Sequence, residues 1–419
     1  MKKGLILGAA AIAAIAVAPT ADAVEVKTSG YYKFRVYDNN PNFTSAAGGD
    51  NNRTWGNRMQ INTDFTTGAS SLHLRYRPVD TAQLANMTGT DPRNAAAAWA
   101  IKQLWLETSM WGVAVKVGDM PVKLNDSWLV SDGGNSFPTI LLAKGFGDIT
   151  VVGAEVKVQE GAANNSDDDI DLWVLSVVGA SGAYNWQVTG AYADIGDGFN
   201  AGLPNGDENF WLAGTLSTQF EGMKLAGTVI WESGWENLGA VVGAAAGDPD
   251  DGDFLLALNI GGDASWGGWK GYFVYAGEEF DAINKVSADE PIITAAWDEG
   301  GPGQAMLLTR ALAGINYHSS VSGNAQFSNM WALGVNASLK AGGWTITPAV
   351  DFVAAADDKK SRTIDSAFGG SLKVSTSVAD DTTFSLIGVV VDASQKNALP
   401  AGTDEELAHS LIAELNYKF

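Results

Sequence analysis

Apolar and polar residues alternate along almost the whole chain, and this period of two limits the fold more than any other feature of the sequence. Leu72, Leu74 and Tyr76, for example, are separated by polar side chains. Such alternation is typical of half-buried β-strands, because successive side chains of a strand point to opposite faces. No segment after residue 23 shows a helical period. The sequence therefore predicts an all-β protein whose strands are roughly ten residues long.

The composition excludes several other classes of protein. Hydrophobic residues make up 46% of the chain, which is too many for a disordered protein. The formal net charge of −22 argues against a nucleic-acid binder, because phosphate contacts need clustered Lys and Arg. The absence of cysteine excludes disulfides, thiolate zinc sites and cysteine nucleophiles. No stretch after residue 23 reaches the ~18 consecutive apolar residues that a membrane-spanning helix needs.

The first 23 residues have the three parts of a secretory signal. Lys2 and Lys3 form a short basic start, an apolar run covers residues 4–17, and Ala21-Asp22-Ala23 is a small-x-small cleavage site. A membrane anchor is the alternative, but the apolar run is too short to span a bilayer and no stop-transfer flank follows. We therefore expect a signal peptide over residues 1–23, export, and one mature domain over residues 24–419.

The connections between the expected strands are of two kinds. Tight ones, such as 67–69 and 341–343, suit hairpins, whereas others, such as 38–54 and 281–327, are long. The two kinds alternate, which is typical of a transmembrane β-barrel with short periplasmic turns and long extracellular loops. A soluble β-sandwich or propeller is the alternative, but neither fold has a reason to keep its loops short at one end and long at the other.

Counting the segments favours an antiparallel up-and-down barrel of eighteen strands. Seventeen segments are predicted to be strands, and a bacterial barrel with both termini in the periplasm needs an even number. The missing strand is placed at Pro138–Lys144, before the tight turn 145–147. Sixteen strands is the alternative, if a weak segment such as 169–180 is irregular. Pro348 lies inside an expected strand, where it cannot donate a ladder hydrogen bond.

Aromatic residues support the membrane interpretation. Ten tryptophans fall near expected strand ends: Trp55, Trp99, Trp111, Trp186, Trp211, Trp231, Trp266, Trp269, Trp331 and Trp344. An amphipathic ring belongs there if the strand ends lie at a membrane interface. Burial in a soluble core is the alternative for each ring, but it does not explain why the rings gather at strand ends.

The last strand carries the most specific motif. Apolar residues stand at every second position counted back from the C-terminus: Phe419, Tyr417, Leu415, Ala413 and Leu411. This strand resembles the terminal strand of Gram-negative outer-membrane proteins, and residues 24–419 as a whole resemble the outer-membrane porins, a family of 16- to 18-stranded channels. The resemblance implies an outer-membrane location, contact with outer-membrane lipid, recognition of the last strand by the outer-membrane assembly machinery, and a homotrimer.

Alternation also assigns side chains to the lumen. Five basic residues of the first three strands fall on the face opposite the apolar one: Lys33, Arg35, Arg58, Arg75 and Arg77. If this basic wall dominates the lumen, small anions are favoured there, although the acidic total charge opposes this at the mouth. Ordinary solvation of charges in a water-filled lumen is the alternative.

The segment that follows the fifth strand resembles, in position, the third loop of porins, which folds into the lumen and faces a basic cluster. The resemblance implies that residues of about 118–147 narrow the pore, with Asp119, Asp126 and Asp132 as the acidic partners of the arginines. The long segment 281–327 is apolar in patches that would be costly to expose. We therefore expect it to be an ordered loop that packs over or into the pore mouth.

These features favour a passive outer-membrane channel for small polar or ionic solutes over an enzyme. The only histidines, His73, His318 and His409, show no spacing typical of a Ser-His-acid site. A substrate-specific channel, for example for sugars, is the first alternative, but a lumen track of aromatic rings has only Trp211 and Trp173 as candidates. A structural or adhesive barrel is the second.

No cofactor or resident metal ion is expected. Two acidic runs, 167–169 and 248–253, are candidates for loop-bound Ca²⁺, because clustered carboxylates suit that ion. Their spacing does not match an EF-hand loop, and solvated loops with counter-ions are the alternative.

Overall fold

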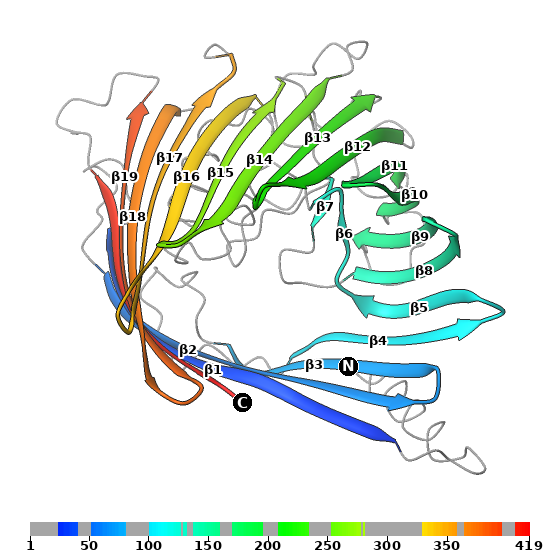
Figure 1. The fold of residues 1–419 in the computed structure, drawn as a ribbon, viewed down its shortest axis with the longest axis horizontal. Coiled ribbons are helices and arrows are strands. Elements are labelled where there is room, and N and C mark those ends of the chain that lie inside the picture. The colour runs from blue at the N-terminus through cyan, green and yellow to red at the C-terminus, as the bar shows by residue number, and fades with distance from the viewer. Residues whose placement is uncertain are drawn as a thin grey trace.

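The computed structural model describes residues 24–40, 52–80, 100–126, 129–131, 137–159, 170–195, 208–233, 253–277, 280, 329–357, 364–395 and 407–419. All the regular structure in these ranges is β (Figure 1). None of the described residues belongs to a helix that is long and apolar enough to cross a membrane. The strands are β1 (Glu25–Asn40), β2 (Asn52–Thr67), β3 (Ser70–Asp80), β4 (Ala100–Met110), β5 (Val113–Met120), β6 (Lys123–Leu124), β7 (Val130–Ser131), β8 (Phe137–Phe146), β9 (Ile149–Gln159), β10 (Ile170–Ser181), β11 (Tyr184–Ile195), β12 (Glu208–Phe220), β13 (Met223–Ser233), β14 (Phe254–Ala264), β15 (Gly267–Ala276), β16 (Met330–Ala341), β17 (Trp344–Ala355), β18 (Ile364–Ala379), β19 (Thr382–Gln395) and β20 (Ala408–Lys418).

Eighteen of these strands form one closed antiparallel barrel, and the short strands β6 and β7 pair only with each other. Each barrel strand pairs with the strands before and after it in sequence; β5 pairs with β8, and β20 pairs with β1 to close the ring. The prediction of a closed barrel is therefore confirmed, with the favoured strand number. The strand inferred at 138–144 is β8, and the weak segment at 169–180 is β10, which is paired on both sides.

The two ends of the barrel differ in how the strands are joined. One end, here called the turn end, carries tight hairpins such as Glu221-Gly222, where both residues have positive φ angles (47° and 81°) as a type I′ turn requires. We call the opposite end the loop end. Pro348 interrupts the ladder between β16 and β17, because no pair is formed between Asn336↔Ala349 and Leu339↔Ile346.

The closing seam pairs β1 with the C-terminal strand from Tyr31↔Lys418 to Asn40↔His409, and Gly30 and Phe419 extend it at the turn end. The backbones of Gly30 and Phe419 exchange two hydrogen bonds, with N···O distances of 2.8 and 3.1 Å. A Cβ on Gly30 would lie 2.6 Å from the Phe419 ring, so glycine allows the ring to cover the seam. The alternate apolar residues of the last strand, from Leu411 to Phe419, face outward as the sequence predicted. Glu414, which lies between two of them, faces inward.

The outer face of the barrel is apolar and exposed. Aromatic side chains gather on it at both ends: at the loop end Phe210 contacts Trp231 (ring centroids 6.3 Å apart) and Phe254 contacts Tyr275 (5.3 Å). At the turn end Trp266 and Trp344 are exposed. Two aromatic bands around an apolar belt are what a lipid-facing barrel presents. Exposed aliphatic residues of the belt include Leu106, Ile140, Leu175, Val188, Leu216, Val229, Leu258, Val335, Leu386 and Leu411.

Candidate functional site

The predicted basic wall lies on the inner face of β1, β2 and β3. Lys33 pairs directly across the ladder with Arg58, and both lie on the face opposite the exposed Tyr32. Arg75 pairs with Gln103 of β4, whose side chain is buried inside the barrel. A β-bulge between β2 and β3 leaves Arg77 beside Gln60. The pairing register thus places these residues on the inner face, and their role in the pore stays a prediction.

The partners of two of these basic residues differ from those expected. Arg35 donates from Nε to Glu414 Oε2 of β20 at 2.5 Å, across the closing seam. Arg77 donates from Nε to Gln60 Oε1 at 2.9 Å. The sequence contained the signal for Glu414, because it lies on the polar face of the last strand, but only the β1–β20 pairing places it beside Arg35.

An infolded segment does lie inside the barrel, between the end of β5 and the start of β8. Asn125 donates from Nδ2 to Thr215 Oγ1 of β12 at 3.1 Å, and Thr215 is hydrogen-bonded in turn to Thr228 of β13. Leu129 is fully buried in the same hydrophobic cluster as the inner wall. The segment is shorter than the predicted range of 118–147, because β8 returns to the barrel wall at Phe137.

The three predicted acidic partners do not meet the arginines in the described residues. Asp119 pairs with Leu104 and Pro138 and shares the outward face of Val117, which corrects the expectation that it projects into the lumen. Asp126 lies inside the barrel, but beside the wall of β11–β16. Burial raises the pKa of the Asp126 carboxyl. Asp132 lies outside the described residues.

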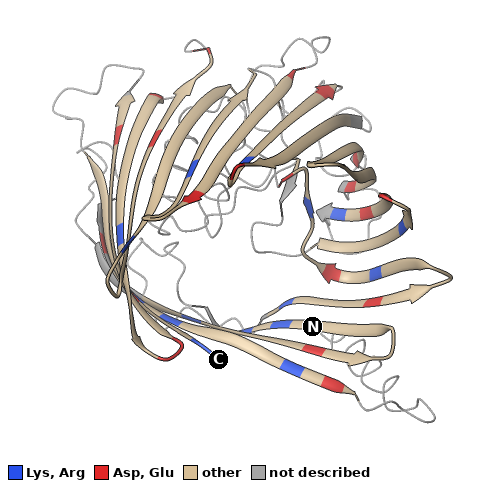
Figure 2. Ribbon diagram, viewed as in Figure 1, with Lys and Arg blue, Asp and Glu red and all other residues tan. Residues whose placement is uncertain are grey.

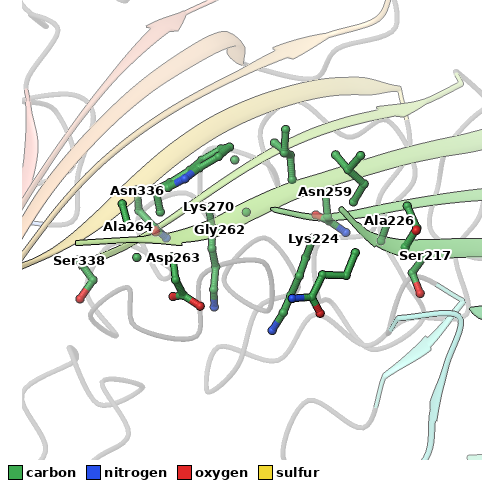
Figure 3. Close-up of a pocket in the computed structure, with 18 of the residues that line it drawn as sticks. Ser217, Lys224, Ala226, Asn259, Gly262, Asp263, Ala264, Lys270, Asn336 and Ser338 are labelled. Carbon is green, nitrogen blue, oxygen red and sulfur yellow. The ribbon is translucent and has the colours of Figure 1, made fainter. Parts of the chain in front are cut away.

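A cavity of about 1100 Å³ opens beside Asp126 in the turn-end half of the barrel. Its lining comes from β11 to β16 and their turns, and Figure 3 shows Lys224, Lys270 and Asp263 reaching into it. Residues that face one another on successive strands form a row across this wall. The complete row nearest the turn end contains Gln219, Lys224, Gly261, Lys270 and Asn336 on β12 to β16.

Towards the loop end, the inward rows of this wall change from polar to apolar. Ser217, Ala226, Asn259, Tyr272 and Gly334 form the row above the lysines. The small Gly334 lies between Tyr272 and Asp351, and the Tyr272 hydroxyl donates across it to Asp351 Oδ1 at 2.6 Å. Closer to the loop end, one row of inward residues is fully buried and apolar: Ala213, Ile230, Leu255, Ala276 and Met330. The inner wall here is thus a hydrophobic core at one end and a polar cavity at the other.

A second polar group surrounds His73 on the inner face of β2 to β5. His73 Nδ1 lies 2.7 Å from Asp64 Oδ1, and its ring stacks on Trp105 with centroids 4.5 Å apart. Glu107 bonds to Lys116 at 3.0 Å and lies 3.8 Å from His73 Nε2. These contacts join His73 to two carboxylates and an aromatic ring rather than to a hydroxyl nucleophile. His409 lies at the loop end of β20, and His318 is outside the described residues.

Other candidate sites are only partly covered. Trp211 is buried on the inner face, whereas Trp173 is half exposed on the outer face, so the two do not form a lumen track. Within the described ranges, no three His, Cys, Asp or Glu side chains are grouped to hold a metal ion. Apart from Asp253, the acidic runs considered for Ca²⁺ lie outside the described residues, as does the whole of segment 281–327, and those expectations remain predictions.

Comparison with known proteins identifies the fold. No protein-family model and no curated protein matches the chain. Solved structures of proteins from Pseudomonas aeruginosa and Acinetobacter baumannii do resemble it over nearly its whole length. Pseudomonas aeruginosa OccK9 (OpdG) matches with a TM-score of 0.57 at 11% identity, covering 94% of this chain and 98% of that one. Pseudomonas aeruginosa OpdK, solved with vanillate, matches with a TM-score of 0.56 at 8% identity over the same shares. Acinetobacter baumannii OccAB4 matches with a TM-score of 0.55 at 8% identity, covering 96% and 99%.

Proposed function

We propose that this protein is an outer-membrane channel of the porin type in a Gram-negative bacterium, through which small polar or ionic solutes diffuse passively. The observation that carries the proposal is the division between the two faces of the barrel. The outer face is an apolar belt between aromatic bands, and the inner face holds charged side chains and a cavity of about 1100 Å³. A closed barrel in lipid satisfies the hydrogen-bonding groups of its backbone. Charged side chains around a cavity on its inner face suit the passage of polar solutes.

Several further statements belong to the same proposal. The chain is exported by a cleaved signal over residues 1–23, the assembly machinery reads the strand that ends at Phe419, and the protein assembles as a homotrimer. The described inner face supports a channel over an enzyme, because the contacts of His73 there are with the carboxylates of Asp64 and Glu107 and not with a hydroxyl nucleophile. A substrate-specific channel is the second candidate, and it is favoured by the polar cavity confined to one part of the wall.

Conductance in a planar lipid bilayer tests the proposal. The purified protein should give stepwise current increases in KCl, each with a fixed unit conductance. Heat-unfolded protein from the same preparation is the matched control and should give none. If the folded protein inserts but carries no current, a structural or adhesive barrel becomes the better interpretation. Saturation of the current by one solute, with no such effect of other solutes of similar size, would favour the substrate-specific channel.

A further inference from the structure

We propose that Lys224 and Lys270 form a binding site for a multivalent oxyanion, carboxylate or phosphate, in the turn-end half of the lumen. The inference rests on the proposed function, because it assigns a class of solute to the lumen of the same channel. It involves a different wall from the arginines of β1 to β3, which lie across the barrel from β13 to β15 in Figure 1.

The pairing register brings the two lysines together. Lys224 of β13 faces Gly261 of β14, and Gly261 faces Lys270 of β15. The two lysine Cα atoms are therefore two strands apart, a separation of about 10 Å. A Cβ on Gly261 would lie 3.3 Å from the Lys270 Cγ, so the glycine leaves room for the Lys270 side chain to lean over β14, the strand that separates it from Lys224. Figure 3 shows both lysine side chains extended into the cavity.

The two ammonium groups also have no partner among the described residues. Neither Lys224 nor Lys270 makes an ion pair or a hydrogen bond with any described residue, and the same holds for Lys340, which lines the same cavity. By contrast, Arg35 and Lys116 on the other inner wall are paired with carboxylates. Like charges held on one wall repel, and an anion placed between them removes that repulsion while gaining two attractions.

Neutral donors surround the lysine pair. Asn336 lies in the same row, opposite Lys270, and Asn259 lies one row nearer the loop end. Both side chains line the cavity, as does that of Ser338. Amide and hydroxyl groups can donate to several oxygens of a polyatomic anion, in addition to the charge-assisted bonds from lysine. This set of donors suits carboxylate or phosphate oxygens better than a halide ion.

Two acids limit the strength of the site. Asp263 and Asp126 line the same cavity, so its three lysines exceed its carboxylates by one charge. Asp263 lies on β14, two residues beyond Gly261, and faces Gly268. A net excess of one positive charge favours weak, reversible binding, which a conducting channel needs because a solute must both enter and leave. A multivalent anion gains more from the lysine pair than a monovalent one does.

Calorimetric titration of the folded barrel in detergent tests the site independently of conduction. The probes are inorganic pyrophosphate for the phosphate class and citrate for the carboxylate class, both at low ionic strength. The double variant Lys224→Gln/Lys270→Gln should bind the preferred probe about tenfold more weakly. Asp263→Asn should bind it more tightly, since a repelling charge is removed. Lys144→Gln is the matched control, because Lys144 lies on the outer face with its Nζ 5.5 Å from the Phe146 ring centroid.

The outcomes separate this inference from the proposed function. Binding of either probe that weakens in the lysine double variant, strengthens in Asp263→Asn and is unchanged in Lys144→Gln supports the site, and the better probe identifies the anion class. No binding by the wild-type protein, or equal binding by the lysine double variant, overturns it. Wild-type conductance in KCl together with either of those results leaves the channel proposal standing and removes only the anion site. Anion binding without conductance would support the anion site and contradict the channel proposal.

Discussion

The inner faces of β1–β3 and of β12–β16 follow the same alternation yet have opposite chemistry. On the first wall, basic residues extend into the half nearer the loop end, where Arg35 pairs with Glu414. On the second wall, the corresponding half is a buried apolar surface that includes Ile230 and Leu255. Figure 2 shows Lys and Arg on strands of both walls. Alternation thus determines which face a side chain occupies, but it does not determine whether the inner face is a water-lined channel or a packed core.

The division within β13 gives the prediction with the largest expected effect. Ile230 and Ala226 lie on the same inward face, but Ile230 is fully buried and Ala226 lines the cavity. Ile230→Asp should lower the free energy of unfolding by about 3–5 kcal/mol or prevent folding, because it buries an unpaired charge. Ala226→Asp should change it by about 0.5 kcal/mol or less. Urea unfolding followed by tryptophan fluorescence in detergent measures both, and equal destabilisation would contradict a division of this wall.

The boundary between the two halves gives the second prediction. Tyr272 donates to Asp351, and both side chains are buried in the row above the lysines. Tyr272→Phe should lower the free energy of unfolding by about 1–3 kcal/mol, because a buried carboxylate loses a donor. The double variant Tyr272→Phe/Asp351→Asn should recover part of this loss, since a neutral amide tolerates the missing donor better. The same unfolding assay applies, and a fully stable Tyr272→Phe would mean that water reaches Asp351.

Much of the fold could be predicted from the sequence, because lipid requires an apolar outer face and a closed set of paired strands. The strand boundaries, the hairpin turns and the outward face follow from alternation and from Gly-containing turns such as Glu221-Gly222. The apolar inner wall is also visible in the sequence. Residues 254–258 (Phe-Leu-Leu-Ala-Leu) are apolar without alternation, which is typical of a strand that is buried on both faces. This departure from alternation is the signal in the sequence for the apolar inner wall.

The site was harder to predict because its contacts join distant strands. Alternation indicates the inward face of the arginines, but it does not reveal the pairing of Arg35 with Glu414, which depends on barrel closure. It also missed the lysine pair, because Lys224 and Lys270 become neighbours only through Gly261 of the strand between them. Asp119 was misplaced because an infolded loop was expected to begin at residue 118, whereas β5 continues to Met120 and keeps Asp119 on the outer face.

The smallest effect is expected on the basic wall, where side chains can be changed without disturbing a core. Arg58 and Arg75 lie on neighbouring strands and face inward. Replacing both with Gln should leave the unfolding midpoint nearly unchanged, because lumen positions avoid the cost of charge facing lipid. It should lower the preference for anions about two- to fivefold, the effect of removing partly screened charges worth about 0.4–1 kcal/mol. The reversal potential of the channel in a KCl gradient measures this shift.

The same double variant also compares the two walls as determinants of pore size. The infolded segment contacts β12 through Asn125, so it lies on the wall opposite the arginines. If that segment sets the narrowest passage, Arg58→Gln/Arg75→Gln should change ion selectivity more than the size limit for neutral solutes. Lys144→Gln, which removes a charge from the outer face, is the control and should alter neither quantity. An unchanged reversal potential together with an enlarged size limit would instead mean that the arginines act as a steric barrier and that their charges are neutralised within the wall.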